Sequence, residues 1–307
     1  MDDHVHDSVY DEELLGGDAS HWAFGHDFED PLAGVDTTIP EGVDHEELAA
    51  YCLMLGDDAL VLSHRLSEWC SHAPDLEEDI ALANVALDLL GQARLLLARA
   101  AAASPTVVPE LPPGSPVPPE DALAFFRDDA GFRNVRLVEP GNGDFAVTVL
   151  RLLLFSTWRL ALLQRLAGSR DHVLSAIAAK GVKEMTYHRD YAARWFLTLA
   201  QGTDESRSRL LAALPQVLCF HDELFTDHPV ERSVAEAGVG VAPSAVSAEV
   251  GMVLEQVFSV SGVQRVDVPQ VGPVAGGGGR HGRHTEALSH LLAEMQSVAR
   301  AHPLGVW

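Results

Sequence analysis

The chain has 307 residues, 47% of them hydrophobic and 21% charged, so it can bury one large core without disulfides. Its formal net charge of -24 repels polyphosphate backbones and argues against nucleic-acid binding. Its three cysteines, Cys52, Cys70 and Cys219, lack CxxC spacing and are predicted to be buried small side chains. No apolar run reaches the ~18 residues of a membrane span. A cytoplasmic protein is therefore expected.

Residues 1–44 are rich in acids and scattered histidines and have no sustained apolar period. This composition predicts a disordered acidic extension, because such a segment buries too little apolar surface to offset the entropy lost on ordering. Its histidines fit no fixed ligand spacing and are expected to be solvated: His4, His6, His21 and His26. A helical domain is therefore expected over residues 45–307.

A helix is predicted over residues 46–71, and the segment 73–103 carries the strongest helix signal. Asp75 follows Pro74 as a good N-cap, acids fill the first turn, and Arg94 and Arg99 come late. Apolar residues recur at helical spacing, as a face that a bundle would bury: Leu76, Ile80, Ala83, Leu87, Leu90 and Leu97. The proline-rich stretch at about 104–119 is predicted to be a surface linker.

Further helices are predicted over residues 143–167, 170–200, 204–225, 243–258 and 285–301. Breaks are expected at Gly141, Gly202, Pro229, Gly240, the glycine run 276–279 and Pro303. Helices of ~20 to 30 residues joined by mostly short turns favour an antiparallel bundle, because each apolar face must be buried against a neighbour. The fold class is therefore predicted to be all-α.

A long-helix bundle can hold a carboxylate-bridged di-metal site, which takes one Glu from each of two helices and Glu-x-x-His from each of two others. The helix at 73–103 offers Asn84 and Asp88 instead, and neither is followed by His three residues later. The helix at 170–200 offers Glu184 and His188, which are spaced i, i+4. With one half-site missing, we interpret these four residues as vestigial positions and expect no metal in this chain.

Three arginines, Arg127, Arg133 and Arg136, fall within ten residues of an otherwise acidic chain. They are suited to a phosphate or an acidic partner surface. The alternative is local pairing with neighbouring acids: Asp128, Asp129 and Glu139. No GxSxG motif occurs, and the glycine run lacks the Lys-Ser/Thr ending of a phosphate loop.

Five ordered blocks give the chain a recognisable resemblance. They are LGDDALVLSHRLSEWCSHAPDLEEDIALANVALDLLGQAR from Leu55, AFFRDD from Ala124, LVEPGNGDFA from Leu137, IAAKGVKEMTYH from Ile177 and GRHGRHTEALSHLLAEMQ from Gly279. Over residues 47–307 the chain resembles a family, the non-catalytic structural subunits of the bacterial phenylacetyl-CoA 1,2-epoxidase, a multicomponent monooxygenase. The extension before residue 45 and the length of the proline-rich linker are not part of the resemblance.

The resemblance implies a ferritin-like bundle with a degenerate di-iron site, acting as the structural partner of a homologous di-iron catalytic subunit in aerobic phenylacetate catabolism. The complex of that family uses O2 and NADPH, and a reductase subunit with flavin and an iron-sulfur centre delivers the electrons. The resemblance also places phenylacetyl-CoA at the subunit boundary. The residues implied to approach its CoA portion lie in two segments: Gly131, Phe132, Arg133 and Asn134, then Arg232, Ser233 and Val234.

Two other functions fit the same residues. A degenerate oxidase would hold a single metal at Glu184 and His188, and an assembly or interaction protein would make no contact with substrate. A DNA-protecting ferritin relative is disfavoured by the net charge.

Overall fold

A computed structural model describes residues 32, 34–274 and 276–305. Within these ranges the secondary structure consists of α-helices and short 3-10 turns, with no strand, so the all-α prediction is confirmed. Most of the segment predicted to be a disordered extension, with its four histidines, lies outside the described residues.

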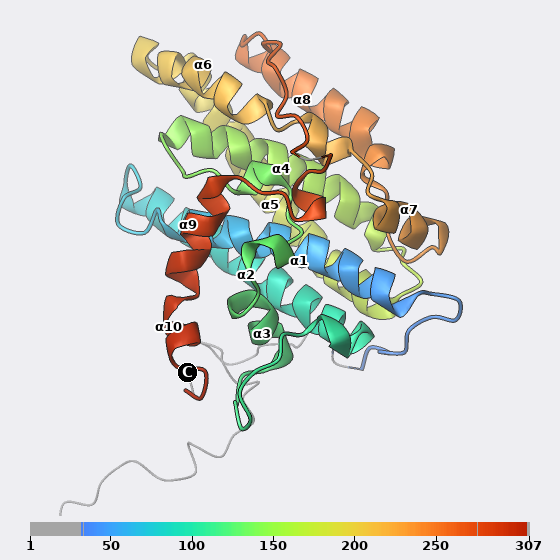
Figure 1. Cartoon of the computed structure of the whole chain (residues 1–307). Helices are drawn as coiled ribbons and strands as arrows, with labels where there is room; N and C mark the ends of the chain where they lie inside the picture. The colour runs from blue at the N-terminus through green and yellow to red at the C-terminus, as the bar shows by residue number, and fades with distance from the viewer. Residues whose placement is uncertain (1–31, 33, 275, 306–307) are drawn as a thin grey trace, which may run out of the picture.

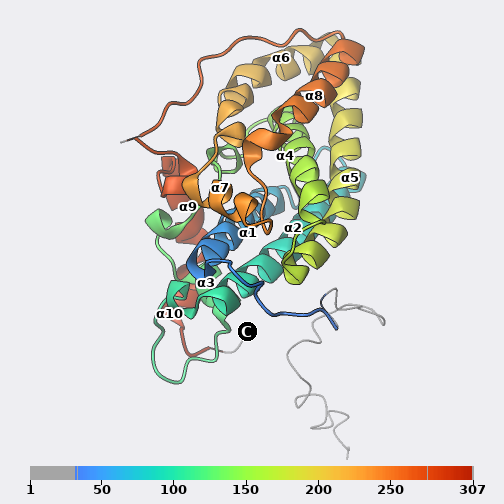
Figure 2. The same cartoon turned by 90° about the vertical axis from the view of Figure 1, so that its right-hand side faces the viewer.

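Four long helices form the central bundle (Figures 1 and 2). They are α1 (His45–Ser67), α2 (Leu76–Ala103), α4 (Phe145–Leu166) and α5 (His172–Gln201). The pairs α1–α2 and α4–α5 each pack along their length and are joined by short loops, which makes them antiparallel neighbours. This arrangement is the ferritin-like bundle that the resemblance implies.

Each of these four helices begins at an aspartate N-cap. Asp75 accepts a hydrogen bond from the backbone N–H of Glu78, as predicted, and Asp44, Asp144 and Asp171 cap the other three in the same way. A carboxylate at this position satisfies free backbone donors and complements the helix dipole. The sequence therefore specifies where the bundle helices start.

Shorter helices cover the bundle. α6 (Asp204–Leu218) and α8 (Ser247–Ser261) pack on α4 and α5, α7 (Pro229–Glu236) packs on α1, and α3 (Pro119–Phe125) on α2. Towards the C-terminus, α9 (Glu286–Met295) and α10 (Ser297–Ala301) follow. Figure 1 shows them beside α1, α2 and α3.

Several predicted boundaries were wrong. The helix predicted over 204–225 ends at Leu218, and the one over 285–301 is interrupted at Gln296, whose side chain donates to the carbonyls of Ala124 and Arg127. Pro229 was interpreted as a break, but it stands at N1 of α7, where its missing N–H costs nothing. α3 was missed for the same reason, since a proline opens it too.

The folded domain also begins earlier than the predicted residue 45. Leu32, Val35 and Ile39 pack against the core, Val43 is buried, and Arg99 donates a hydrogen bond to the carbonyl of Thr37. These contacts join residues 32–44 to the bundle.

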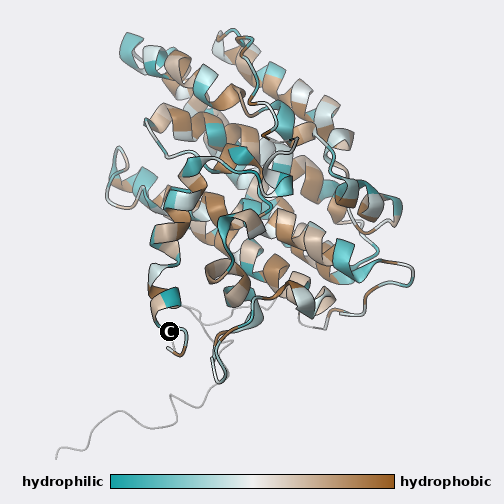
Figure 3. Ribbon diagram, viewed as in Figure 1, coloured by the Kyte–Doolittle hydropathy of each residue, from teal (hydrophilic) through white to brown (hydrophobic). Residues whose placement is uncertain are grey.

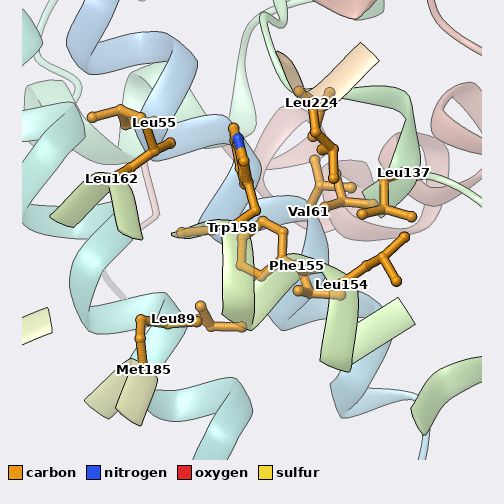
Figure 4. Packing of buried hydrophobic residues seen from close by; sticks show 14 of the residues in the cluster. Leu55, Val61, Leu89, Leu137, Leu154, Phe155, Trp158, Leu162, Met185 and Leu224 are labelled. Atoms are coloured by element: carbon orange, nitrogen blue, oxygen red, sulfur yellow. The ribbon is translucent and has the colours of Figure 1, made fainter. Parts of the chain in front are cut away.

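Aromatic and aliphatic side chains fill the space between the four helices (Figure 4). Trp158 and Phe155 of α4 lie at its centre with Leu55 of α1 and Leu89 of α2 around them. Figure 3 shows hydrophobic segments along these inner helices. Of the three cysteines predicted to be buried only Cys52 is; Cys70 is exposed and Cys219 is half-buried. Cys70 follows the end of α1, and Cys219 follows the end of α6, where it packs against the core from one side.

Most of the predicted apolar face of α2 is not its buried face, although Leu97 is buried and Ala83 is half-buried. Leu76, Ile80, Leu87 and Leu90 are 69%, 54%, 61% and 40% exposed, whereas Leu82, Val85, Leu89 and Leu96 are buried. α2 is apolar on both sides, and a periodicity cannot say which of two apolar stripes the bundle covers. α2 and α4 both have the length and hydropathy of a membrane span, but the apolar window of α4 is 100% buried and that of α2 only 44%.

Candidate functional site

One polar side chain from each bundle helix meets at the centre of the bundle. Asp58 of α1, Gln92 of α2 and Arg159 of α4 are almost fully buried, and Glu184 of α5 joins them at the edge. Arg159 Nη2 donates to Gln92 Oε1 at 3.4 Å, and Gln92 Nε2 donates to Glu184 Oε2 at 2.9 Å. Arg159 Nη1 lies 3.9 Å from Asp58 Oδ2. We call these four residues the central network.

Local packing leaves room for the central network. A Cβ on Gly181 of α5 would lie 2.7 Å from Leu163 Cδ1 and 3.4 Å from the Gln92 side-chain amide carbon. Glycine at this position therefore lets α5 approach α4 while the amide of Gln92 spans to Glu184.

Arg159 places a permanent positive charge inside the bundle. Burial lowers the pKa of its guanidinium to about 10, even though Asp58 favours the charged form, so it stays protonated at neutral pH. Among the described residues, no atom accepts a hydrogen bond from its Nε or Nη1. The charge is therefore balanced mainly by the carboxylate of Asp58.

Asp58 is in turn held from outside the bundle by Arg280. Both terminal nitrogens of Arg280 donate to Asp58 at 2.9 Å, and the backbone N–H of Val135 donates to it at 2.8 Å. Arg280 Nε also lies 3.3 Å from Glu231 Oε1 of α7. Burial works against the charged form of Arg280, but Asp58 and Glu231 outweigh it and raise its pKa.

The four vestigial positions are placed differently from one another. His188 is buried and its Nε2 lies 2.9 Å from Asp88 Oδ2, while Glu184 contacts Gln92 and lies 3.5 Å from Lys180 Nζ. Asn84 is exposed and does not face the central network, and its place in a former ligand set stays a prediction. It lies about 80° around α2 from Gln92, which is the residue of α2 in the central network.

These residues do not fit a di-iron centre. The central network offers two carboxylates, each already engaged, and it puts an amide and a guanidinium where such a centre takes Glu and Glu-x-x-His. His188 points to Asp88 instead of joining the network. Across the described ranges no three His, Cys, Asp or Glu side chains are grouped to hold a metal ion.

The arginines near residue 130 do not pair with the neighbouring acids, so that alternative was wrong. Arg127 forms a buried ion pair with Asp57 of α1, and Arg136 pairs with Glu223 at 2.9 Å. The side chain of Arg133 donates to two backbone carbonyls, those of residues 130 and 132. The guanidinium groups of Arg127 and Arg136 thus stabilise the fold through ion pairs. Only that of Arg133 has no acidic hydrogen-bond partner among the described residues, although the backbone N–H of Arg133 donates to Asp57 at 2.9 Å.

Only part of the seven residues implied for CoA is accessible. Phe132 and Asn134 are 0% exposed and Val234 is 2% exposed, so these three side chains are not accessible, and the implied approach of these residues to CoA stays a prediction. Phe132 lies under the Arg127 guanidinium at 4.3 Å, which explains its burial. Ser233 is half-buried and donates to Glu47. Gly131 and Arg133 are half-buried, and Arg232 is exposed.

The structure brings the two implied segments together around His228. Burial lowers the pKa of His228 to about 4, and four nearby basic residues add to the effect: His281, Arg280, Arg133 and Arg232. The rings of His228 and His281 lie 4.6 Å apart. We call these five residues the cationic cluster. The guanidinium groups of Arg133 and Arg232 make it suited to an anion, whereas His228 is neutral near pH 7.

A glycine turn sets the position of Arg133 within this cluster. Gly282 has φ of 68°, and a Cβ there would lie 2.8 Å from Arg133 Nη1 and 2.4 Å from the carbonyl oxygen of Ala130. The turn that carries Arg280 and His281 therefore packs directly on the loop of Arg133.

Sequence reasoning missed Asp58, Gln92, Arg159, Arg280 and His228. A signal existed for two of them. Arg159 is a lone charge in the apolar run LLLFSTWRLALL, and GRHGRH is a basic block in an acidic chain. A charge in a helix that must be buried indicates a polar partner inside the core.

Comparison with known proteins gives two matches. The protein family described as "Phenylacetic acid catabolic protein" matches this chain over residues 35–307. A subunit of the 1,2-phenylacetyl-CoA epoxidase of Escherichia coli (strain K12) is 42% identical over 261 residues, which is 85% of this chain and 99% of that protein.

Proposed function

The chain belongs to the phenylacetic acid catabolic protein family, and on this premise we propose that it is the non-catalytic subunit that supports the di-iron subunit of a phenylacetyl-CoA epoxidase. The oxygen chemistry then takes place in the homologous partner. This chain stabilises the fold of the partner and helps to form the site that binds the thioester.

One observation carries the non-catalytic role: Arg159 occupies the bundle centre among Asp58, Gln92 and Glu184. Its charge opposes a second cation, and its neighbours supply too few free anionic ligands for two irons. The same arrangement stabilises the bundle without metal, because polar groups from all four helices are joined through it. We infer that the central network joins the four helices of this chain, as metal ligation joins those of the partner.

Metal analysis and turnover test this proposal. The purified chain is expected to bind iron at well below one equivalent and to show no oxygen-dependent turnover of phenylacetyl-CoA. Addition of the di-iron subunit and reductase should restore turnover. Two irons per chain, or turnover by the chain alone, would contradict the proposal.

A double variant, Glu184→Gln with His188→Asn, separates the proposal from the single-metal oxidase. Both changes keep a hydrogen-bonding side chain of similar size while removing metal ligands. The reconstituted complex should keep its kcat if these residues only join α2 and α5. A loss of turnover matched by a loss of one metal ion from this chain would favour the oxidase.

We further propose that the cationic cluster receives a phosphate of the CoA portion at the subunit boundary. Arg133 and Arg232 are its accessible guanidinium groups, and guanidinium binds phosphate through charge-assisted, bidentate hydrogen bonds. Binding of a CoA thioester to the two-subunit complex, with and without Arg133→Ala, tests this. Equal affinity would favour an assembly role without substrate contact.

The remaining components follow from the same proposal. Electrons come from NADPH through a reductase subunit with flavin and an iron-sulfur centre, and the complex acts in the cytoplasm. This chain is expected to carry no cofactor of its own.

A further inference from the structure

The side chain of Arg133 is held by the backbone carbonyl of the residue before it. The carbonyl oxygen of Phe132 accepts a hydrogen bond from Arg133 Nη1 at 2.8 Å, and it also lies 3.0 Å from His284 Nε2. The side chain of His284 is only 4% exposed, so this second contact is made in the interior of the protein. One carbonyl therefore joins the Arg133 guanidinium to a buried imidazole that the proposed anion contact does not use.

The other ring nitrogen of His284 faces a buried carboxylate. His284 Nδ1 lies 2.6 Å from Glu139 Oε1, and the side chain of Glu139 is 0% exposed. Oε1 of Glu139 also accepts from Asn134 Nδ2 at 2.9 Å, and Oε2 accepts from the backbone N–H of Thr285 at 2.6 Å. Because N–H groups donate to both oxygens, the ionised form of this carboxylate is favoured.

These two acceptors determine which hydrogens the imidazole carries. A carbonyl oxygen has no hydrogen to donate, so His284 Nε2 must be the donor in its contact with Phe132. An ionised Glu139 also only accepts, so Nδ1 donates as well, and the ring is held as an imidazolium. Charge-assisted hydrogen bonds are about twice as strong as neutral ones, so the Phe132 carbonyl is fixed on one side while Arg133 donates to the other.

We propose that His284 is a positioning residue for Arg133: it fixes the Phe132 carbonyl, and through that carbonyl it orients the Arg133 guanidinium within the cationic cluster. This inference rests on the proposed contact of Arg133 with a phosphate of CoA. The guanidinium donates to the carbonyls of Ala130 and Phe132 and to no acidic side chain of the described residues. Its orientation therefore depends on how firmly those two carbonyls are held.

Orienting the guanidinium in advance favours binding of the anion. A free arginine side chain loses rotamer freedom when it binds a phosphate, and a side chain that is already oriented loses less. The phosphate contact is the same in the ground state and in the transition state, so a poorly oriented Arg133 should raise KM and leave kcat unchanged. Residues that serve only to stabilise the fold would not produce this split.

His284→Gln removes the donor to Phe132 while keeping a polar side chain. The amide has one donor group, which should bond to the charged Glu139, and the carbonyl then loses its partner. Steady-state kinetics of the reconstituted complex with the CoA thioester should show KM raised about three- to tenfold, the effect of one hydrogen bond, with kcat unchanged. His284→Met should give the same rise. His290→Gln is the matched control, since His290 is 76% exposed on α9 and its KM should be that of the wild type.

Glu139→Gln separates positioning from folding. The new amide can donate to Nδ1 of a neutral ring, and Nε2 then keeps its hydrogen for the Phe132 carbonyl. This variant should melt at a lower temperature, because it loses a buried ion pair, yet keep the wild-type KM. If Glu139→Gln raises KM as much as His284→Gln does, the KM effect follows from lost stability and the inference is overturned.

The double variant Arg133→Ala with His284→Gln tests whether His284 acts through Arg133. Its KM should equal that of Arg133→Ala alone, because no guanidinium is left to orient, and a further rise would overturn the inference. An unchanged KM for His284→Gln, where Arg133→Ala raises it, would overturn the inference alone. An unchanged KM for Arg133→Ala would instead contradict the proposed CoA contact.

Discussion

Replacing Arg280 by Met removes the guanidinium that neutralises two buried carboxylates. Arg280 donates twice to Asp58 and lies 3.3 Å from Glu231, and both acids are at most 1% exposed. Met keeps most of the aliphatic length of the side chain, so the change removes charge and hydrogen bonds more than volume. It also removes bonds to the carbonyls of Met54 and Arg133, which join the C-terminal turn to the bundle.

The expected cost follows from the buried acids that remain. Removing one partner of a buried ion pair typically costs about 3 to 5 kcal/mol, because the other charge stays in the interior without compensation. A domain of this size melts about 2 to 4 °C lower for each kcal/mol lost, so Tm should fall by about 6 °C or more. Arg165→Met is the control. Its ion pair with Glu249 is about 40% exposed on both sides and should contribute under about 1 kcal/mol.

Urea unfolding followed by circular dichroism measures both variants. The double variant Glu231→Gln with Arg280→Met should recover part of the loss, because Glu231 is then no longer an unpaired buried charge while Asp58 still faces Arg159; the expected coupling energy is about 2 kcal/mol. If Arg280→Met costs no more than Arg165→Met, the Asp58–Arg280–Glu231 cluster does not stabilise the fold as argued.

Arg133→Ala should weaken the affinity for the CoA thioester by roughly 10 to 150-fold. It should raise KM far more than it lowers kcat, because a phosphate contact is present in both the ground state and the transition state. An unchanged KM at two salt concentrations would remove Arg133 from the site. For His228, the folded pKa of about 4 lies below the ordinary 6.5, so the unfolded chain binds more protons between these values and stability should fall as pH drops from about 6.5 to 4. His228→Asn keeps an N-cap acceptor for α7 and should flatten this pH dependence, and an unchanged slope would refute the assignment. Deleting residues 1–43 should lower Tm by several degrees relative to deleting residues 1–31, because Val43, Ile39 and the Arg99–Thr37 hydrogen bond are lost; equal melting would show that segment 32–43 contributes nothing.

The sequence alone determined the helical class and much of the helix layout. N-cap aspartates and helical periodicity are local signals, and Asp75 with its acidic first turn places the start of α2 without knowledge of the rest of the chain. The missing Glu-x-x-His was equally visible, since ligand spacing within one helix is a property of the sequence. Proline was misinterpreted where it opens a helix, as at Pro229, because the same residue also ends helices.

Only the tertiary structure decided which side chains meet. The periodicity of α2 showed an apolar stripe through Leu76 and Leu87, but the rotation of the helix in the bundle buried the opposite stripe instead. Arg159 and Arg280 are distant in sequence from Asp58, and their convergence depends on the register of α1, α4 and the C-terminal turn. Helical periodicity acts over a few residues, whereas ion pairs across a bundle depend on how whole helices pack, so the central network and the cationic cluster could not be read from the chain.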